Sequence, residues 1–270
     1  MKKIFYLVFV FVLSFSYDVS AQVLDWSKPE KPVTFGIRYG INFAGLANPY
    51  TGQYKSYEAY EDVNVELVGN DTYKSGRKSI NLGLSVDFNI NKSFAIATGA
   101  YYSVKGCVMT SSQVIAGPEV LGDKKNPYLG VGWDMEESTT QAYFHIPVCA
   151  SLRFWANKDL KFHLDAGGYM SYIVGGSVKF ESSSESLKDE DDKNYEYEED
   201  YSNDGRHKFD AGLRFGVAAT WKRLYLGAHY ELGLTRLYSS SHGWMAKSGD
   251  YANYKDERNK CLSVDLGFNF

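Results

Sequence analysis

After residue 22 the sequence contains no apolar run of eighteen residues, the length that a membrane-spanning helix requires. Cysteine is scarce, with three residues and no C-x-x-C spacing, so a redox motif is excluded. Proline, with 6 residues, and methionine, with 5, are also few. The 29 basic side chains do not outnumber the 33 acidic ones, and a net charge of -4 gives no reason to expect nucleic acid as a partner.

Aromatic residues and glycine are abundant by contrast. Aromatics make up 16% of the chain, with 22 tyrosines, and there are 25 glycines. This composition is typical of short strands joined by polar loops. We therefore expect an all-β protein.

The N-terminus has the three parts of an export signal. Lys2 and Lys3 precede an apolar stretch at 4–15, and small residues stand at 19–21. The stretch is too short for a transmembrane helix, and no cysteine is present for lipoprotein processing. We expect 1–21 to be a signal peptide, 22–32 a short periplasmic N-terminal segment, and 33–270 the folded domain.

The remaining chain alternates apolar and polar residues with a period of two. Phe35, Ile37 and Tyr39 share one parity, for example, while Gly36 and Arg38 share the other. The pattern predicts eight strands, at 34–43, 80–88, 94–102, 144–154, 162–170, 209–221, 224–234 and 262–270.

The connections between these segments alternate strictly between short and long. Tight links lie around 89–91, 157–159 and 222–223, whereas the long connections are 46–78, 106–139, 175–207 and 237–259. Outer-membrane barrels have short periplasmic turns and long external loops, an asymmetry that a soluble lipocalin-type barrel does not need. The sequence predicts an eight-stranded antiparallel up-and-down transmembrane β-barrel with short periplasmic turns and four long extracellular loops, located in the bacterial outer membrane.

The apolar parity supports a lipid-facing surface. It contains no Asp, Glu, Lys or Arg in any of the eight segments, as expected where a charge at mid-bilayer costs about 2–4 kcal/mol. Aromatic residues gather at the expected periplasmic ends of the strands, where they would form one interfacial girdle. These girdle residues are Phe35, Phe88, Phe94, Phe154, Trp155, Phe162, Trp221 and Phe270.

The opposite parity carries charged residues that would fill the lumen. An eight-stranded barrel has an interior just wide enough for side chains, so we expect a paired ionic plug. A proton or ion path is the alternative. Three histidines share this parity, but they lie on different strands without metal-ligand spacing, so no metal is assigned. The expected ionic network comprises Arg38, Asp87, Arg153, Asp165, Asp210, Arg214, Glu231 and Asp265.

The long connections offer few chemical signatures. Residues 181–204 contain eleven acidic residues and two lysines, a pattern typical of a solvated loop, with cation binding as the alternative. His242 follows three serines, but no G-x-S-x-G motif is present and no catalytic residue is assigned. Cys107, Cys149 and Cys261 are expected to be unpaired.

Several segments together resemble the PorT-like outer-membrane β-barrel proteins of Bacteroidota. They are 36–46 (GIRYGINFAGL), 143–148 (YFHIPV), 166–172 (AGGYMSY), 230–235 (YELGLT) and 267–270 (GFNF). The resemblance implies a barrel that the outer-membrane assembly machinery inserts by recognising the last strand, with Phe268 and Phe270 as the signal. The family's name-giving member is associated with type IX protein secretion.

We therefore expect a non-enzymatic, monomeric surface protein without cofactors, whose loops mediate interaction, adhesion or a secretion-associated role. Its expected partners are outer-membrane lipid and lipopolysaccharide, the assembly machinery, and a protein or glycan that contacts the aromatic residues of the loops. A narrow channel and a lipid-modifying barrel enzyme are the alternatives. If the domain is soluble, a lipocalin-like ligand carrier replaces them.

Overall fold

The computed structural model describes residues 24–49, 52–60, 63–116, 132–184, 195–200, 207–237 and 257–270. The predicted signal peptide lies outside the described residues, as does much of the acidic segment 181–204. Within the described ranges, no helix is long and apolar enough to span a membrane.

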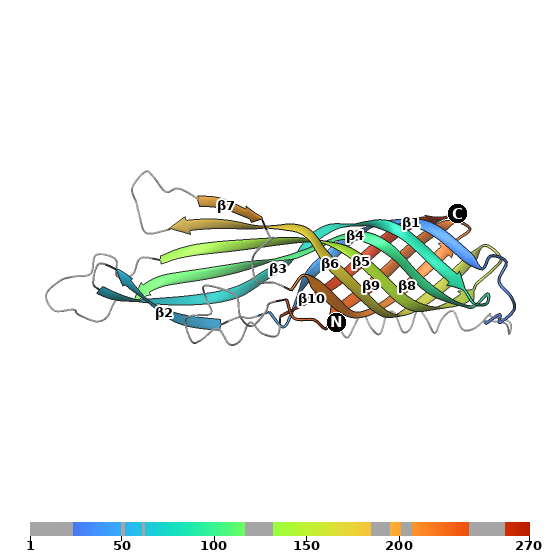
Figure 1. Ribbon diagram of the computed structural model, residues 1–270, viewed down its shortest axis with the longest axis horizontal. Coiled ribbons are helices and arrows are strands. Elements are labelled where there is room, and N and C mark those ends of the chain that lie inside the picture. Colours follow the sequence, from blue (N-terminus) through green and yellow to red (C-terminus); the bar gives the residue numbers. More distant parts are fainter. Residues whose placement is uncertain are drawn as a thin grey trace.

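Eight antiparallel strands form a closed ring (Figure 1), which confirms the predicted fold class. The first strand closes the ring because it pairs with the last strand on one side and with the strand of residues 63–89 on the other. The ring consists of β1 (Val33–Ala47), β3 (Val63–Asn89), β4 (Phe94–Ala116), β5 (Gly132–Trp155), β6 (Leu160–Ser184), β8 (Phe209–Trp221), β9 (Leu224–Gly233) and β10 (Arg258–Asn269).

The two ends of the ring differ, as the connection lengths predict. At one end the strands are joined by the turns 90–93, 156–159 and 222–223, and we call this the short-turn end. The other is the long-loop end, where all the long connections begin. Residues 24–32 lie at the short-turn end, where the backbone N–H of Asn89 donates to Pro32 O at 2.8 Å and that of Lys92 donates to Ser27 O at 3.1 Å.

Four strands continue far beyond the ring at the long-loop end (Figure 1). Ring pairing ends at Ala44–Arg77 and at Tyr172–Phe209, and past these points β3, β4, β5 and β6 form an open sheet. β2 (Gly52–Tyr60) pairs with the start of β3, and β7 (Tyr195–Asp200) pairs with the end of β6. We call this six-stranded part the sheet extension.

The sheet extension corrects the expectation that 46–78, 106–139 and 175–207 are loops, since much of each range is strand. The strands were missed because alternation is imposed only where one face meets lipid and the other a closed lumen. Beyond the ring there is no lumen, and a segment such as 106–116 (GCVMTSSQVIA) carries no period-two pattern. Register shifts in the β3–β4 ladder, between Tyr73 and Asn81, mark the transition.

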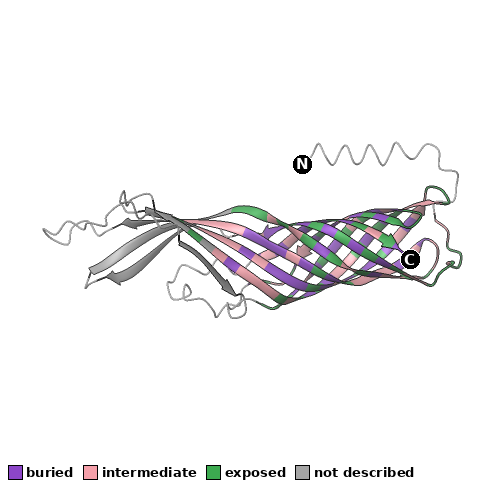
Figure 2. Ribbon diagram, turned by 90° about the horizontal axis from the view of Figure 1, so that it is seen from above, coloured by how far each residue is buried: buried purple, intermediate pink, exposed green. Residues whose placement is uncertain are grey.

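Buried and exposed residues alternate along the ring strands (Figure 2). The residue types at these positions are inverted relative to a water-soluble protein. Apolar side chains point outward, and Leu84 is 61% exposed and Phe35 57%. Inward positions are polar and buried, as Asn42 on β1 is, and the alternation follows the predicted parity. A lipocalin-like carrier would need an apolar interior, so this arrangement excludes that alternative. A continuous apolar exterior of this kind is stable in a bilayer rather than in water.

The lipid-facing surface yields a first prediction. Leu82 points outward from β3, opposite Tyr39 of β1 and Tyr102 of β4. Replacing it with a charged side chain, Leu82→Arg, should lower the free energy of unfolding from lipid vesicles by about 2–4 kcal/mol relative to Leu82→Ala. Urea titration in vesicles measures both, and equal stabilities would mean that Leu82 does not face lipid.

Candidate functional site

The lumen is organised around the carboxylate of Glu231 on β9, which is 2% exposed. Lys105 Nζ on β4 lies 2.8 Å from Glu231 Oε2. Glu231 Oε1 is paired with Arg214 Nη1 on β8 and lies 3.1 Å from His145 Nε2 on β5. Arg214 and Glu231 are direct neighbours in the β8–β9 register, whereas Lys105 and His145 approach from the other wall. This Glu231 cluster therefore braces the barrel across its interior.

Lys105 also joins the cluster to a second carboxylate. Its Nζ lies 3.8 Å from Asp210 Oδ2 and 4.5 Å from the centroid of the Tyr169 ring. Asp210 Oδ2 also accepts hydrogen bonds from Tyr169 OH at 3.2 Å and from Asn259 Nδ2 at 3.0 Å. Lys105 is only 1% exposed, and its ammonium group is surrounded by the two carboxylates and the face of the Tyr169 ring. These contacts compensate for the water that the ammonium group loses on burial.

Lys105 was not among the predicted lumen residues, because the strand predicted from residue 94 ended at residue 102. The signal was present, since Tyr101, Ser103 and Lys105 continue the inward parity and all three are buried. A lysine that points into the lumen is almost never fully buried unless it is paired with a carboxylate. The predicted ionic network contained no lysine.

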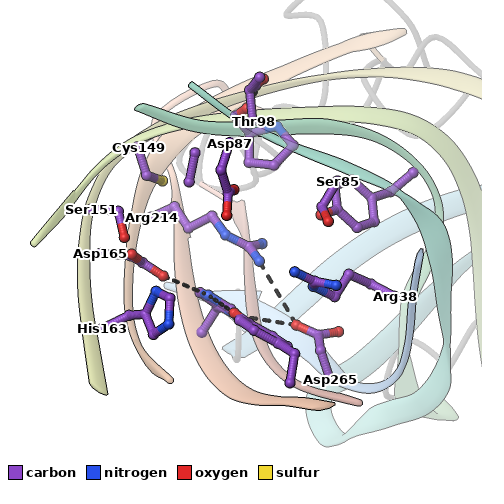
Figure 3. Close-up of a pocket in the computed structure, with 15 residues that line it drawn as sticks. Arg38, Ser85, Asp87, Thr98, Cys149, Ser151, His163, Asp165, Arg214 and Asp265 are labelled. Carbon is purple, nitrogen blue, oxygen red and sulfur yellow. Dashed lines mark hydrogen bonds and ion pairs between the residues drawn. The ribbon is translucent and has the colours of Figure 1, made fainter. Parts of the chain in front are cut away.

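A second group of ionisable residues surrounds Asp265 on β10 (Figure 3). Asp265 Oδ2 lies 3.1 Å from His229 Nδ1 and 3.9 Å from Arg214 Nη2, and Asp265 Oδ1 accepts a hydrogen bond from Asn81 Nδ2 at 2.9 Å. The other ring nitrogen of the histidine, Nε2, lies 3.3 Å from Asp165 Oδ2. Arg214 connects this Asp265 cluster with the Glu231 cluster.

Two further arginines lie nearer the short-turn end. Arg153 Nη2 lies 2.8 Å from Asp87 Oδ2. Arg38 Nη2 donates to Asn269 Oδ1 at 2.7 Å, and its guanidinium carbon lies 3.9 Å from the centroid of the Tyr225 ring. Arg153 and Asp87 therefore form a separate ion pair, and Arg38 is held by the Asn269 amide and the Tyr225 ring. The other five predicted lumen residues belong to one linked network. The linked residues are Asp165, Asp210, Arg214, Glu231 and Asp265.

A small cavity lies between these groups (Figure 3). It measures about 40 Å³ and is lined by Arg38, Asp87 and Asp165 among other polar side chains. A space of this size holds roughly three water molecules.

Three lumen side chains lie in the order of a catalytic triad: a serine, a histidine and a carboxylate. Ser171 Oγ lies 2.7 Å from His145 Nδ1, and the other ring nitrogen faces Glu231. This Ser171–His145 pair was not predicted from the sequence. All three side chains are about 2% exposed, and neither Ser171 nor His145 lines the lumen cavity. Nucleophilic catalysis requires a space in which the substrate meets the serine oxygen, so we interpret the series as structural.

The three lumen histidines do not converge. His145 belongs to the Glu231 cluster, His229 bridges two aspartates, and His163 Nε2 lies 2.9 Å from Thr220 Oγ1. Across the described ranges, no group of His, Cys, Asp and Glu side chains is arranged to hold a metal ion. Cys107, Cys149 and Cys261 are buried, and none of the three forms a disulfide.

The aromatic residues expected to form a girdle lie at the short-turn end, but Trp155 has the parity opposite to Phe154, and its Nε1 donates to Lys92 O in the adjacent turn at 3.3 Å. Phe154 and Phe162 are direct neighbours across the β5–β6 pair, and Trp221 is 55% exposed. Phe268 and Phe270, the expected assembly signal, stack edge to face with ring centroids 5.6 Å apart. Their segment closes the ring, since Phe268 faces Ile37 in the β1–β10 register.

The loop predictions fall largely outside the described residues. Among the loop aromatics, Tyr195 and Tyr197 lie on β7, whereas Tyr201, Trp244, Tyr251 and Tyr254 are not described. Residues 185–194 of the acidic segment and His242 are also outside the described ranges.

The Glu231 cluster yields a second prediction. The substitution Glu231→Gln leaves Lys105 and Arg214 buried without their shared carboxylate, which should lower the free energy of unfolding by about 3–5 kcal/mol. The matched control is Glu136→Gln, which removes a carboxylate paired with exposed Lys74 at 2.5 Å and should cost at most about 1 kcal/mol. Urea unfolding in detergent micelles measures both, and equal losses would contradict the bracing role of Glu231.

Comparison with known proteins places the chain in a family. No curated protein matches it in sequence. Two solved structures of Ail, the attachment invasion locus protein of Yersinia pestis, are similar at 11% and 10% identity with TM-scores of 0.34 and 0.32, the second in complex with the heparin analogue sucrose octasulfate. Each comparison covers 89% of this chain and 100% of the Ail chain. The family model described as "Outer membrane protein beta-barrel domain" matches residues 20–239. Because that match spans more than half of the sequence, the chain belongs to this family of bacterial outer-membrane β-barrel proteins.

Proposed function

We propose that this outer-membrane barrel is a non-enzymatic, monomeric surface protein whose sheet extension mediates interaction with a protein or glycan outside the cell. The observation that carries the proposal is the continuation of β3, β4, β5 and β6 beyond the ring. An anchor needs only enough strand to cross the bilayer, so this additional ordered sheet is available for another role.

The geometry of the sheet extension suits recognition by its backbone. It is open, and β2 and β7 are its outer strands because each pairs with a single neighbour among the described strands. An open edge presents unpaired N–H and C=O groups to which an extended partner segment can add as a further strand. Interaction by strand addition needs no catalytic group, in keeping with a non-enzymatic role.

The lumen supports an anchoring role rather than conduction. The Glu231 cluster spans the interior with buried, mutually paired charges, and the cavity beside it measures about 40 Å³. An ion path would require these side chains to separate, at the cost of leaving charges unpaired. We therefore rank the narrow channel below the anchor.

Lipopolysaccharide is a proposed partner at the long-loop end of the ring. The outward apolar parity of β3 and β10 ends at Ile80 and Leu262, and the next outward positions are Lys78 and Lys260. Lys78 is exposed, and its Nζ lies 6.0 Å from the ring centroid of Phe43. Lysines directly above an apolar belt suit the phosphate groups of an outer-leaflet lipid.

The interaction role predicts a loss of adhesion when the sheet extension is shortened. The ladders place Thr72, Thr110, Glu136 and Glu181 at one level across β3 to β6. Replacing residues 52–71, 111–135 and 182–200 with Gly-Ser linkers should abolish adhesion of expressing cells to immobilised extracellular proteins and glycans, because the exposed sheet edges are removed.

The control is the heat-dependent gel shift of the trimmed protein, which should match that of the full-length barrel because the ring is untouched. Unchanged adhesion by cells displaying the trimmed barrel would overturn the proposal. A secretion-associated, PorT-like role is the remaining alternative, and a loss of exported cargo on gene deletion with adhesion unaffected would favour it.

A further inference from the structure

The short-turn end of the barrel contains a cleft of about 540 Å³ that the proposed function does not use. This volume lies within the range of small-molecule sites. Its lining residues come from the N-terminal segment, from all three short turns and from the adjoining strand ends. Arg153 lines this cleft whereas its partner Asp87 lines the lumen cavity, so their ion pair separates the two spaces.

The cleft is strongly cationic in a chain whose net charge is -4. Its lining includes seven basic side chains and two acidic ones, Asp25 and Glu30. Asp25 is already paired, since its Oδ2 lies 3.1 Å from Lys92 Nζ. Hydrogen bonds from the Ser27 side chain and backbone lower the pKa of Asp25 to about 2, so it stays ionised at neutral pH. The basic residues are Lys31, Lys92, Arg153, Lys158, Lys161, Lys222 and Arg223.

The distribution of these cations points to a shared ligand. Each short turn contributes one or more of them: Lys92 from 90–93, Lys158 from 156–159, and Lys222 from 222–223. Lys158 and Lys222 are both exposed, and Lys222 Nζ lies 5.5 Å from the centroid of the Trp221 ring. Like charges around one cleft repel one another and lower the free energy of unfolding. Folding alone therefore does not require these cations to lie together.

A buried hydrogen-bond donor in the cleft lining also supports a ligand site. Arg153 is 4% exposed, and both of its terminal nitrogens are engaged, Nη1 with Asn89 Oδ1 at 2.5 Å and Nη2 with Asp87. Its Nε has no hydrogen-bond partner in the structure. A buried N–H of this kind costs stability unless an acceptor reaches it.

We propose that the cleft binds a ligand bearing two or more phosphate groups. Lysine ammonium groups act as compact point charges that suit phosphate oxygens, and cations on three separate turns match several phosphates better than one. Trp155 adds an aromatic surface, with Lys161 Nζ 5.4 Å from its ring centroid. The phosphates belong either to a soluble compound or to the headgroup of a lipid with two phosphates in the adjacent leaflet.

The test is calorimetric titration of the full-length barrel with sodium tripolyphosphate, in nanodiscs of phosphatidylcholine at low salt. The double variant Lys158→Gln/Lys222→Gln should bind about tenfold more weakly because two of the cations are lost. The matched control, Lys74→Gln/Lys179→Gln, removes the same charge at the opposite end and should bind like the original protein. Each variant is first checked for the heat-dependent gel shift, which shows that it folds.

Saturable binding that only the short-turn variant weakens supports the proposal. Absence of saturable binding to the unaltered protein, or an equal loss in both variants, overturns it. Equal affinity for citrate, a trivalent carboxylate, overturns the assignment to phosphate. Nanodiscs containing cardiolipin distinguish the two sources, since a weaker apparent affinity for tripolyphosphate identifies the lipid headgroup and an unchanged affinity identifies a soluble ligand.

Discussion

The pairing of β1 with both β3 and β10 is the interaction on which the rest of this structure depends. Within a bilayer no water satisfies backbone N–H and C=O groups, so a sheet survives there only if it has no free edge. Ring closure meets that requirement and simultaneously gives every strand one lipid face and one enclosed face. The period of two in the sequence, apolar outward and polar inward, follows from this single constraint.

Closure also creates the lumen and determines what its charges do. Side chains that point inward leave water, and a buried charge without a partner costs several kcal/mol. For Glu231 this cost is offset by Lys105, Arg214 and His145, which come from three other strands. The same contacts that neutralise the charges tie opposite walls together, so the ionic network acts as the core that a soluble protein would build from apolar side chains.

Much of the ring could be predicted from sequence, because lipid and lumen together impose a strict pattern on residues such as Ile37 and Arg38. The sheet extension could not, since beyond the ring neither environment selects the alternation. Lys105 was missed at that boundary. The cationic cleft was missed for a different reason. Lys158 and Lys222 lie in turns far apart in the chain, and the pairing of β6 with β8 brings these turns together, with Lys222 N donating to Asp159 O at 2.7 Å.

The central claim is a closed barrel embedded in the outer membrane, and the most direct measurement is the gel mobility of the outer-membrane fraction with and without boiling. A closed barrel whose backbone is fully paired resists detergent until it is heated, so the account predicts a clear heat-dependent shift. Recovery of the protein in the soluble periplasmic fraction, with the same mobility before and after boiling, would contradict it.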